Sequence, residues 1–339
     1  MPCTTLDEDL TLALVSAAAA APSLHNVQPW YFRASAPDRT IHVHAAPGRL
    51  LPRSDPDARA VHLSVGAALC NLMAAAVRLG REPVVRLLPE PSRPGLLASV
   101  RLAGRPRSGL LRRPDLHRAL WRRRSSRLPF EPEPVPEPVL SELRDAVRLD
   151  GAELRRPGPF ARTRLLELTA RAEQRLTQDP ARRAETLACL TGPGADWGLP
   201  RYAVGPLDST GRLPLRGFAV PPDGPARDRC AFEADPQLLL LTTRHDGPAA
   251  WLHAGLALQH ALLLLTLHGV RASMLHQALE WPDLRARMSG LCRDRCVPQM
   301  LLRVGYGPAG FPTPRRAAAE LLGPPAPPAP LDRPAATVG

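Results

Sequence analysis

Lysine is absent from this chain of 339 residues, and all 44 of its basic residues are arginine. Asparagine occurs only twice, at Asn26 and Asn71, while alanine, arginine, proline and leucine are abundant. Because this imbalance runs through the whole chain, we attribute the formal charge of +12 to a compositional bias. The arginines are scattered, and no nucleic-acid recognition motif accompanies them. We therefore expect no nucleic-acid partner.

Cysteine is sparse, and its spacing matches no zinc motif. Of the six cysteines only Cys292 and Cys296 lie close together, and no second pair completes a site. We expect free thiols and a cytoplasmic location. Three histidines, His253, His260 and His268, share one face of an expected helix, but successive members are roughly 10–12 Å apart. They cannot bind one ion, so we expect no metal.

Long uninterrupted apolar runs are also missing. The segment 10–21 is apolar, but Asp7, Glu8 and Asp9 precede it, where a signal peptide would carry positive charge. The run 251–268 is interrupted by polar residues, which favours a buried helix over a membrane span. We expect no membrane partner.

The hydrophobic patterns that are present predict an α+β protein. In the first third of the chain they predict helices over 10–21 and 58–79 and strands over 40–45, 84–88 and 97–102. Further on they predict helices from 115 and over 139–147, 165–190 and 248–268, with strands over 238–243 and 299–305. Residues 191–235 are rich in glycine and proline without periodicity, which is typical of a disordered segment or a functional cover.

An internal repeat links the two parts. Residues 57–80 align with 246–269, and Asp57 then matches Asp246, while two glycines in each copy also match. The unit is too long for a solenoid repeat, so we interpret it as a duplicated domain. We expect a first half over 1–110 and a second half over 111–322 that contains a lid at 191–235. The Pro/Ala-rich tail 323–339 is expected to be disordered.

Three short motifs together resemble a known family. The stretch Pro22-Ser23-Leu24-His25-Asn26-Val27-Gln28-Pro29-Trp30 resembles the Pro-Ser-x-x-Asn-x-Gln-Pro-Trp motif of the FMN-dependent nitroreductases. The run Arg123-Arg124-Ser125-Ser126-Arg127 resembles their Arg-Arg-Ser-x-Arg motif. With Thr313-Pro314-Arg315-Arg316 and the start of the helix at Trp251, the duplicated chain is similar to the actinobacterial Acg branch.

The resemblance implies a nitroreductase-like fold that forms a pseudodimer within one chain. Family members are homodimers whose two FMN sites are each built from both subunits. Here the first half would donate the loop and the second half the arginines, which implies one composite site and a monomeric protein. The implied FMN-binding residues are Pro22, Ser23, Leu24, Asn26, Arg123, Arg124, Ser125, Arg127, His276, Gln277, Arg315 and Arg316.

The residue types suit those roles. Arginine side chains and a serine hydroxyl bind a phosphate through charge-assisted hydrogen bonds, and by similarity the backbone at His276 and Gln277 faces the flavin ring. FMN carries the redox chemistry itself, so no catalytic side chain is assigned. From the residues alone, two other interpretations stay open: Arg123 and its neighbours form a solvated helix end, and Asn26 only shapes a turn.

Two functions follow from the resemblance, and a third, an arginine-driven nucleic-acid binder, stays open from the composition. The first is an oxidoreductase that binds FMN, uses NADH or NADPH as co-substrate and reduces a small-molecule electron acceptor. The alternative is a flavin-sequestering or storage protein, in which the lid over 191–235 prevents turnover.

Overall fold

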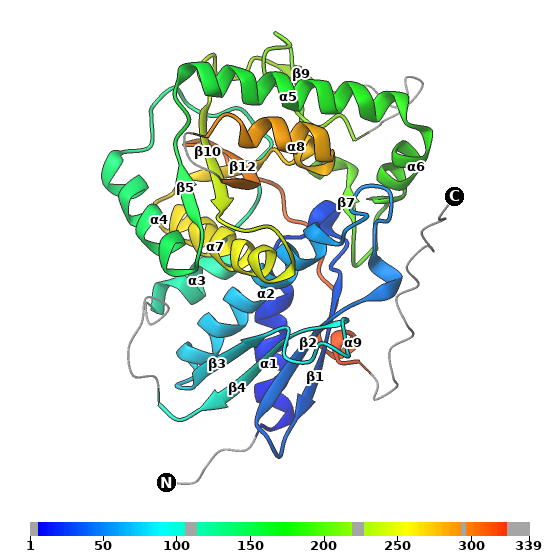
Figure 1. The fold of residues 1–339 in the computed structure, drawn as a ribbon, viewed down its shortest axis with the longest axis vertical. Coiled ribbons are helices and arrows are strands. Elements are labelled where there is room, and N and C mark those ends of the chain that lie inside the picture. The colour runs from blue at the N-terminus through cyan, green and yellow to red at the C-terminus, as the bar shows by residue number, and fades with distance from the viewer. Residues whose placement is uncertain (1–5, 106–113, 219–226, 293–295, 324–339) are drawn as a thin grey trace.

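The computed structural model describes residues 6–105, 114–218, 227–292 and 296–323, and forms two antiparallel sheets with helices between and around them (Figure 1). The expected α+β class is therefore confirmed. The tail beyond residue 323 lies outside the described residues, as does Cys3.

The first sheet has the strand order β1-β2-β4-β3, in which neighbours are antiparallel. Its strands are β1 (Trp30–Ser35), β2 (Thr40–Ala45), β3 (Glu82–Leu87) and β4 (Leu96–Ala103). The helices of this half are α1 (Glu8–Ala19) and α2 (Arg59–Arg78). Three of its strands and both helices follow the predicted ranges closely, because alternating or periodic apolar residues face one core.

The second sheet has the order β11-β12-β10-β5, and it is also antiparallel. Its strands are β5 (Glu153–Arg155), β10 (Gln237–Thr243), β11 (Arg271–Met274) and β12 (Val297–Gly305). Its helices are α3 (Pro114–Arg122), α4 (Glu137–Leu149), α5 (Pro159–Gln178), α6 (Pro180–Ala188), α7 (Pro248–Leu267) and α8 (Pro282–Ser289). Short α9 (Ala318–Leu321) packs back against α1 and β1 of the first half.

Two sequence expectations were wrong. The segment 165–190 is two helices, because Asp179 caps α6 through the backbone N–H of Arg182 and Pro180 fills its first turn. The expectation that all cysteines are free is also wrong, because Cys292 and Cys296 form a disulfide. Among the described residues, Cys70, Cys189 and Cys230 are free.

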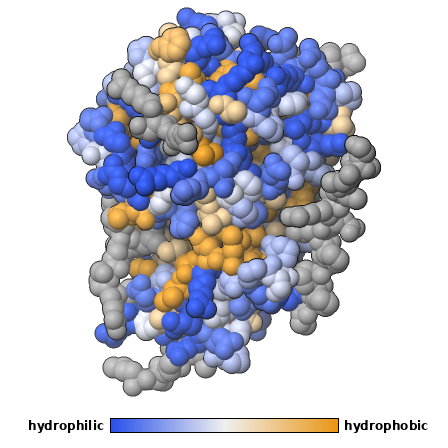
Figure 2. All heavy atoms as spheres, viewed as in Figure 1, coloured by the Kyte–Doolittle hydropathy of each residue, from blue (hydrophilic) through white to orange (hydrophobic). Residues whose placement is uncertain are grey.

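Helices α2 and α7 lie side by side between the two sheets (Figure 1). Both are long and apolar enough to cross a membrane by length and composition alone, but 78% and 72% of their apolar windows are buried inside the protein. One hydrophobic core runs through both halves around this pair, and it includes Leu69 and Leu263. The face in Figure 2 is largely hydrophilic, with hydrophobic side chains gathered below its middle.

The α2–α7 contact depends on glycine. A Cβ atom at Gly66 would stand 2.2 Å from the carbonyl oxygen of Leu252, and one at Gly255 would stand 2.1 Å from that of Leu63. The backbones therefore approach too closely for any side chain. Near this crossing, Gln259 of α7 donates its amide N–H to Asn71 of α2 at 2.7 Å. The matched glycines of the repeat thus meet each other, although the duplication itself stays an inference.

We predict that Gly255→Ala lowers the free energy of unfolding by at least about 2 kcal/mol, because the added methyl must push two backbones apart. Denaturant unfolding followed by circular dichroism measures the change. Gly48→Ala is the control, because nothing lies within 4 Å of its Cβ position. Equal stability of the two variants would contradict the glycine requirement.

Candidate functional site

A strained loop over residues 22–29 follows α1. His25, Asn26 and Gln28 have φ values of 48°, 57° and 51°, which is the left-handed region. Such conformations cost on the order of 1 kcal/mol or more for each non-glycine residue and persist only where surrounding contacts fix them. One fixing contact is inside the loop, where the Ser23 hydroxyl accepts the Gln28 backbone N–H at 3.0 Å.

The Asn26 side chain provides the next contacts. Its Nδ2 donates to the carbonyl oxygens of Gly198 at 2.9 Å and Pro314 at 3.0 Å, and its Oδ1 accepts from Arg315 at 2.8 Å. The Asn26 carbonyl also accepts the backbone N–H of Gly198 at 3.0 Å. Asn26 therefore joins the first half to two distant segments of the second. Its contact with a cofactor stays a prediction.

The Gln28 side chain repeats this pattern and is fully buried. Its Nε2 donates to the Asp196 carbonyl at 2.9 Å, and its Oε1 accepts the Arg316 backbone N–H at 3.0 Å. Both amides of the motif thus bind the segment after residue 191 and the segment around Arg315. The loop therefore connects these two segments through side-chain hydrogen bonds.

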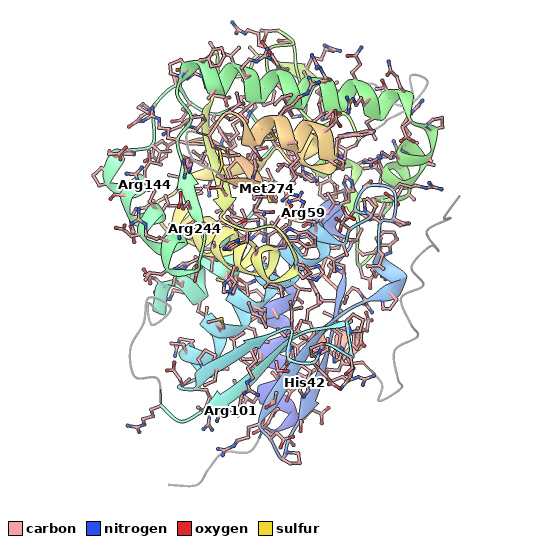
Figure 3. The ribbon with its side chains drawn as sticks, viewed as in Figure 1. His42, Arg59, Arg101, Arg144, Arg244 and Met274 are labelled. Atoms are coloured by element: carbon pink, nitrogen blue, oxygen red, sulfur yellow. A yellow bond between two sulfur atoms is a disulfide. The ribbon has the colours of Figure 1, made fainter. Side chains whose placement is uncertain are left out.

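Two cavities adjoin behind this loop. The inner cavity has about 780 Å³ of free space including its open mouth, and the arginine cavity has about 410 Å³. They adjoin because they share Pro22, Ser23, Ser125, Arg127 and Met274 as lining residues. Residues of α2 line the inner cavity on one side, and Met274 at the end of β11 lines it on another. Figure 3 shows Met274 and Arg59 near the centre of the molecule.

The arginine cavity concentrates positive charge. Burial, followed by the charges of Arg315 and Arg124, lowers the pKa of Arg123 to about 9. Burial and the charge of Arg124 lower the pKa of Arg315 to about 10. Within the described residues no carboxylate pairs with these three arginines, and the buried Nε atoms of Arg123 and Arg315 have no hydrogen-bond acceptor. Buried unpaired donors of one charge indicate an anion site.

The structure brings most of the predicted site residues together. Those that line the arginine cavity are Pro22, Ser23, Asn26, Arg123, Arg124, Ser125, Arg127 and Arg315, and those that line the inner cavity include Leu24 and His276. Gln277 and Arg316 line neither cavity. Gln277 instead donates to the Pro214 carbonyl at 3.1 Å, and Arg316 Nε lies 3.7 Å from Asp196. Their binding to a cofactor stays a prediction.

The inner cavity also has lining residues that the sequence did not single out. Arg59, the first residue of α2, donates to the carbonyls of Gln299 at 2.9 Å and Leu279 at 3.3 Å. Burial lowers its pKa to about 10. Arg216 and Phe218 come from the aperiodic segment, where no pattern marks individual residues. Arg59 belongs to no recognisable sequence motif, so the sequence likewise did not mark it as a cavity residue.

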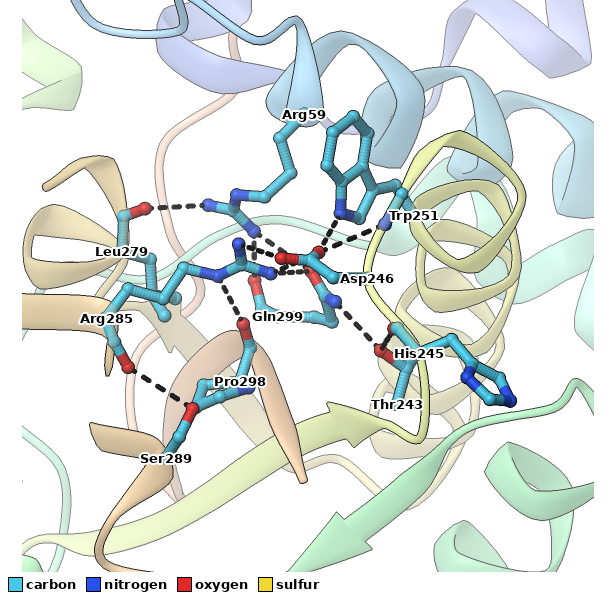
Figure 4. A network of polar contacts seen from close by, with 11 residues as sticks. Arg59, Thr243, His245, Asp246, Trp251, Leu279, Arg285, Ser289, Pro298 and Gln299 are labelled. Carbon is cyan, nitrogen blue, oxygen red and sulfur yellow. Dashed lines mark hydrogen bonds and ion pairs between the residues drawn. The ribbon is translucent and has the colours of Figure 1, made fainter. Parts of the chain in front are cut away.

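A polar network fixes the start of α2 to the second sheet (Figure 4). Arg285 binds both carboxylate oxygens of Asp246 at 2.8 Å, and Gln299 accepts from Arg285 at 3.2 Å and from Arg59 at 3.3 Å. Both Asp246 and the matched aspartate, Asp57, are exposed, but among the described residues Asp57 has no ion pair. The two matched positions therefore differ in their contacts.

The predicted lid, described over 191–218 and 227–235, reaches the inner cavity through Arg216 and Phe218. Arg216 is buried and pairs with Glu280, and its Nε lies 4.0 Å from Glu173. The guanidinium of Arg127 lies 5.3 Å from the centre of the Phe218 ring. These contacts hold the lid segment across the cavity, and its closure over a flavin stays a prediction.

No family model matches the chain. Uncharacterized protein Rv3127 of Mycobacterium tuberculosis (strain ATCC 25618 / H37Rv) is 31% identical over 304 residues, which cover 87% of this chain and 88% of that protein. The protein named "Putative NAD(P)H nitroreductase acg" from the same strain is 28% identical over 311 residues, covering 91% and 92%. "Putative NAD(P)H nitroreductase Rv3131" is 28% identical over 321 residues, covering 93% and 92%.

Among solved structures, the FMN and NADPH-dependent nitroreductase NfnB from sphigopyxis sp. strain HMH is similar to this chain with a TM-score of 0.39 and 21% identity. The match covers 62% of this chain and 99% of that one. The sequence relatives, in contrast, match along nearly the whole length.

We predict that Asn26→Ala exposes the lid segment to trypsin at Arg201 and Arg212. The substitution removes the side-chain donor to the Gly198 and Pro314 carbonyls, which costs about 1–3 kcal/mol of local stability. The cleavage rate of the folded protein measures the effect. Asn71→Ala is the control, because it removes the other asparagine without touching the lid. Equal acceleration in both variants would show that Asn26 does not hold the lid.

Proposed function

The chain belongs to the Acg branch of the nitroreductase family, and from this we propose that it is an FMN-binding oxidoreductase. It takes electrons from NADH or NADPH and passes them to a small-molecule acceptor. Two of the three relatives described above carry the words putative NAD(P)H nitroreductase in their names, and the site residues of this chain support the same chemistry.

The arginine cavity is the observation that carries the proposal. Arg123, Arg124 and Arg315 are cations without a carboxylate partner among the described residues, and two of them have a buried, unpaired Nε. The terminal phosphate of FMN is a dianion with several acceptor oxygens, so it fits this donor set. The neighbouring Ser125 adds a hydroxyl. The residues present therefore fit the phosphate end of the cofactor.

The inner cavity fits the other end of FMN. Small and apolar residues of α2, such as Ala60, Leu63 and Ala67, line it together with Met274 and Met300, which suits a flat aromatic ring system. Bound FMN would supply hydride and electron transfer. The protein residues would bind and orient it, and the strained loop at Ser23 and Leu24 would exclude water.

The proposed site is composite. Pro22, Ser23 and α2 come from the first half, and the arginines and Met274 come from the second. We propose that a duplicated chain with halves at 1–110 and 111–322 encloses one flavin and acts as a monomer. A single-chain pseudodimer explains why each half contributes only part of the motif set. We propose no nucleic-acid or membrane partner.

A second function, flavin sequestration without turnover, is favoured by the attachment of the lid segment. Asn26, Gln28 and Arg216 all bind it to other parts of the site. If the lid stays closed, a nicotinamide has no access to the ring. The two functions then differ only in the motion of the lid.

We predict that Arg123→Ala and Arg127→Ala each lower FMN affinity by at least about tenfold, because each removes charge-assisted hydrogen bonds or the positive potential that favours a phosphate. Isothermal titration with FMN measures the loss. Arg122→Ala is the matched control, because Arg122 is the exposed neighbour on α3. Unchanged retention in the first two variants would refute the phosphate assignment.

We predict one FMN for each chain, measured by flavin absorbance against protein concentration. Anaerobic addition of NADH or NADPH should bleach the bound flavin if the protein is an oxidoreductase. Retained flavin that neither nucleotide bleaches would instead support sequestration. A protein that binds no FMN would overturn both functions, and two flavins for each chain would overturn the composite site.

A further inference from the structure

A third cavity adjoins the inner one. This side cavity has about 1080 Å³ of free space including its open mouth, and it shares Leu24, Arg59, Ala60 and His276 with the inner cavity. Glu280 lines the side cavity but not the inner cavity. The wall between the two spaces therefore contains a histidine that faces both and a carboxylate that faces one.

His276 and Glu280 are in contact within this wall. The Nε2 atom of His276 lies 3.3 Å from Oε1 of Glu280. The pair is not aligned as a hydrogen bond, so both ring nitrogens of His276 are buried without a hydrogen-bond partner among the described residues. An unpaired buried imidazole is costly unless another group uses it.

From this geometry we propose that Glu280 and His276 deliver a proton to the inner cavity from solvent in the side cavity. The inference rests on the proposed function. Reduction of a quinone-type acceptor by NADH or NADPH consumes one proton beyond the hydride, since acceptor, NAD(P)H and H⁺ give the reduced acceptor and NAD(P)⁺. That proton must enter an inner cavity that the loop lines and the lid segment crosses.

Each bond to hydrogen that breaks in this relay is matched by one that forms. The O–H bond of Glu280 breaks and an N–H bond forms at His276 Nε2, while the Nδ1–H bond of His276 breaks and that proton bonds to the acceptor oxygen. Solvent in the side cavity then reprotonates Glu280, and proton exchange through the mouth of the inner cavity, once the product has left, restores the Nδ1 tautomer of His276. The electrons come from the nicotinamide, so the relay itself is redox-neutral.

The charges around the pair fit these roles. Burial raises the pKa of Glu280 to about 7, with Glu173 in the same direction, although the nearby charges of Arg216 and Arg182 oppose it. Burial and the charge of Arg216, followed by His25, Arg59 and Arg127, hold the pKa of His276 well below its usual range. At neutral pH the imidazole is thus an uncharged carrier, and the carboxyl is the group that stores the proton.

The neighbouring His25 does not compete for this role. Its ring centre lies 6.1 Å from that of His276, and it lines only the inner cavity. Burial and the charge of Arg216 also hold its pKa well below the usual range. It has no contact with the side cavity from which a proton could be replaced.

The sharpest test compares Glu280→Gln with Glu173→Gln. Both glutamates face Arg216 of the lid segment, but only Glu280 contacts His276. Each variant therefore removes one negative charge beside Arg216, while only the first removes the proton donor. His276→Gln is the companion variant, because it interrupts the path and leaves Glu280 in place.

The flavin-loaded proteins are reduced with dithionite and mixed anaerobically with a quinone or with ferricyanide, which takes electrons without protons. We predict that Glu280→Gln and His276→Gln slow oxidation by the quinone by roughly tenfold or more, the scale of general acid catalysis. Glu280→Gln, which lies outside the inner cavity, should leave oxidation by ferricyanide unchanged. In the wild type the quinone rate should fall as the pH rises through about 7, because Glu280 then loses its proton. Glu280→Gln should abolish this fall.

A second readout needs no flavin. Infrared difference spectra of the flavin-free protein between acidic and alkaline pH should contain a protonated-carboxyl band that Glu280→Gln removes and Glu173→Gln retains. Equal slowing in the two glutamate variants, a wild-type quinone rate in Glu280→Gln, or loss of the ferricyanide rate would overturn the relay. Flavin retention and bleaching by NADH or NADPH test the proposed function separately.

Discussion

The close approach of α2 and α7 is the constraint on which the rest of the structure depends. Gly66 and Gly255 let the two backbones touch, and the two sheets lie on either side of the pair. The start of α2 is thereby fixed against the second sheet, where Arg59 reaches the carbonyls of Leu279 and Gln299. Every cavity wall that α2 contributes is set by this crossing. A wider helix pair would separate the loop at residue 22 from the arginines that complete the site.

The secondary structure was largely readable from the sequence, and so was the grouping of most site residues. Helix α7 and strand β10 follow their predicted ranges because apolar composition and periodicity are local properties. The break at Pro180 was missed because the helical pattern continues across it. The short strand β5 was missed because three residues carry no period. The family resemblance predicted which residues line the cavities together. Local patterns could not, because those residues lie in segments that are far apart in the sequence.

The sequence did not predict the hydrogen-bond and ion-pair partners of the polar side chains. Asn26 was marked by its rarity, but its bonds to Gly198 and Arg315 span 172 and 289 residues. The contacts among Arg216, Glu280 and His276 likewise join the aperiodic segment to η5 (Gln277–Glu280) and the residue before it. Periodicity reports which face of an element is buried, and it carries no information on which distant group a buried amide or carboxylate meets.

The bond between Asn26 and Arg315 has a consequence for the order of events during synthesis. The loop emerges from the ribosome early, but its left-handed residues gain their last supports only after residues 313–316 have been made. The cavity therefore cannot be complete before residues 313–316 have been made. The order of the supports places the maturation of the loop late in folding, although the loop itself is made early.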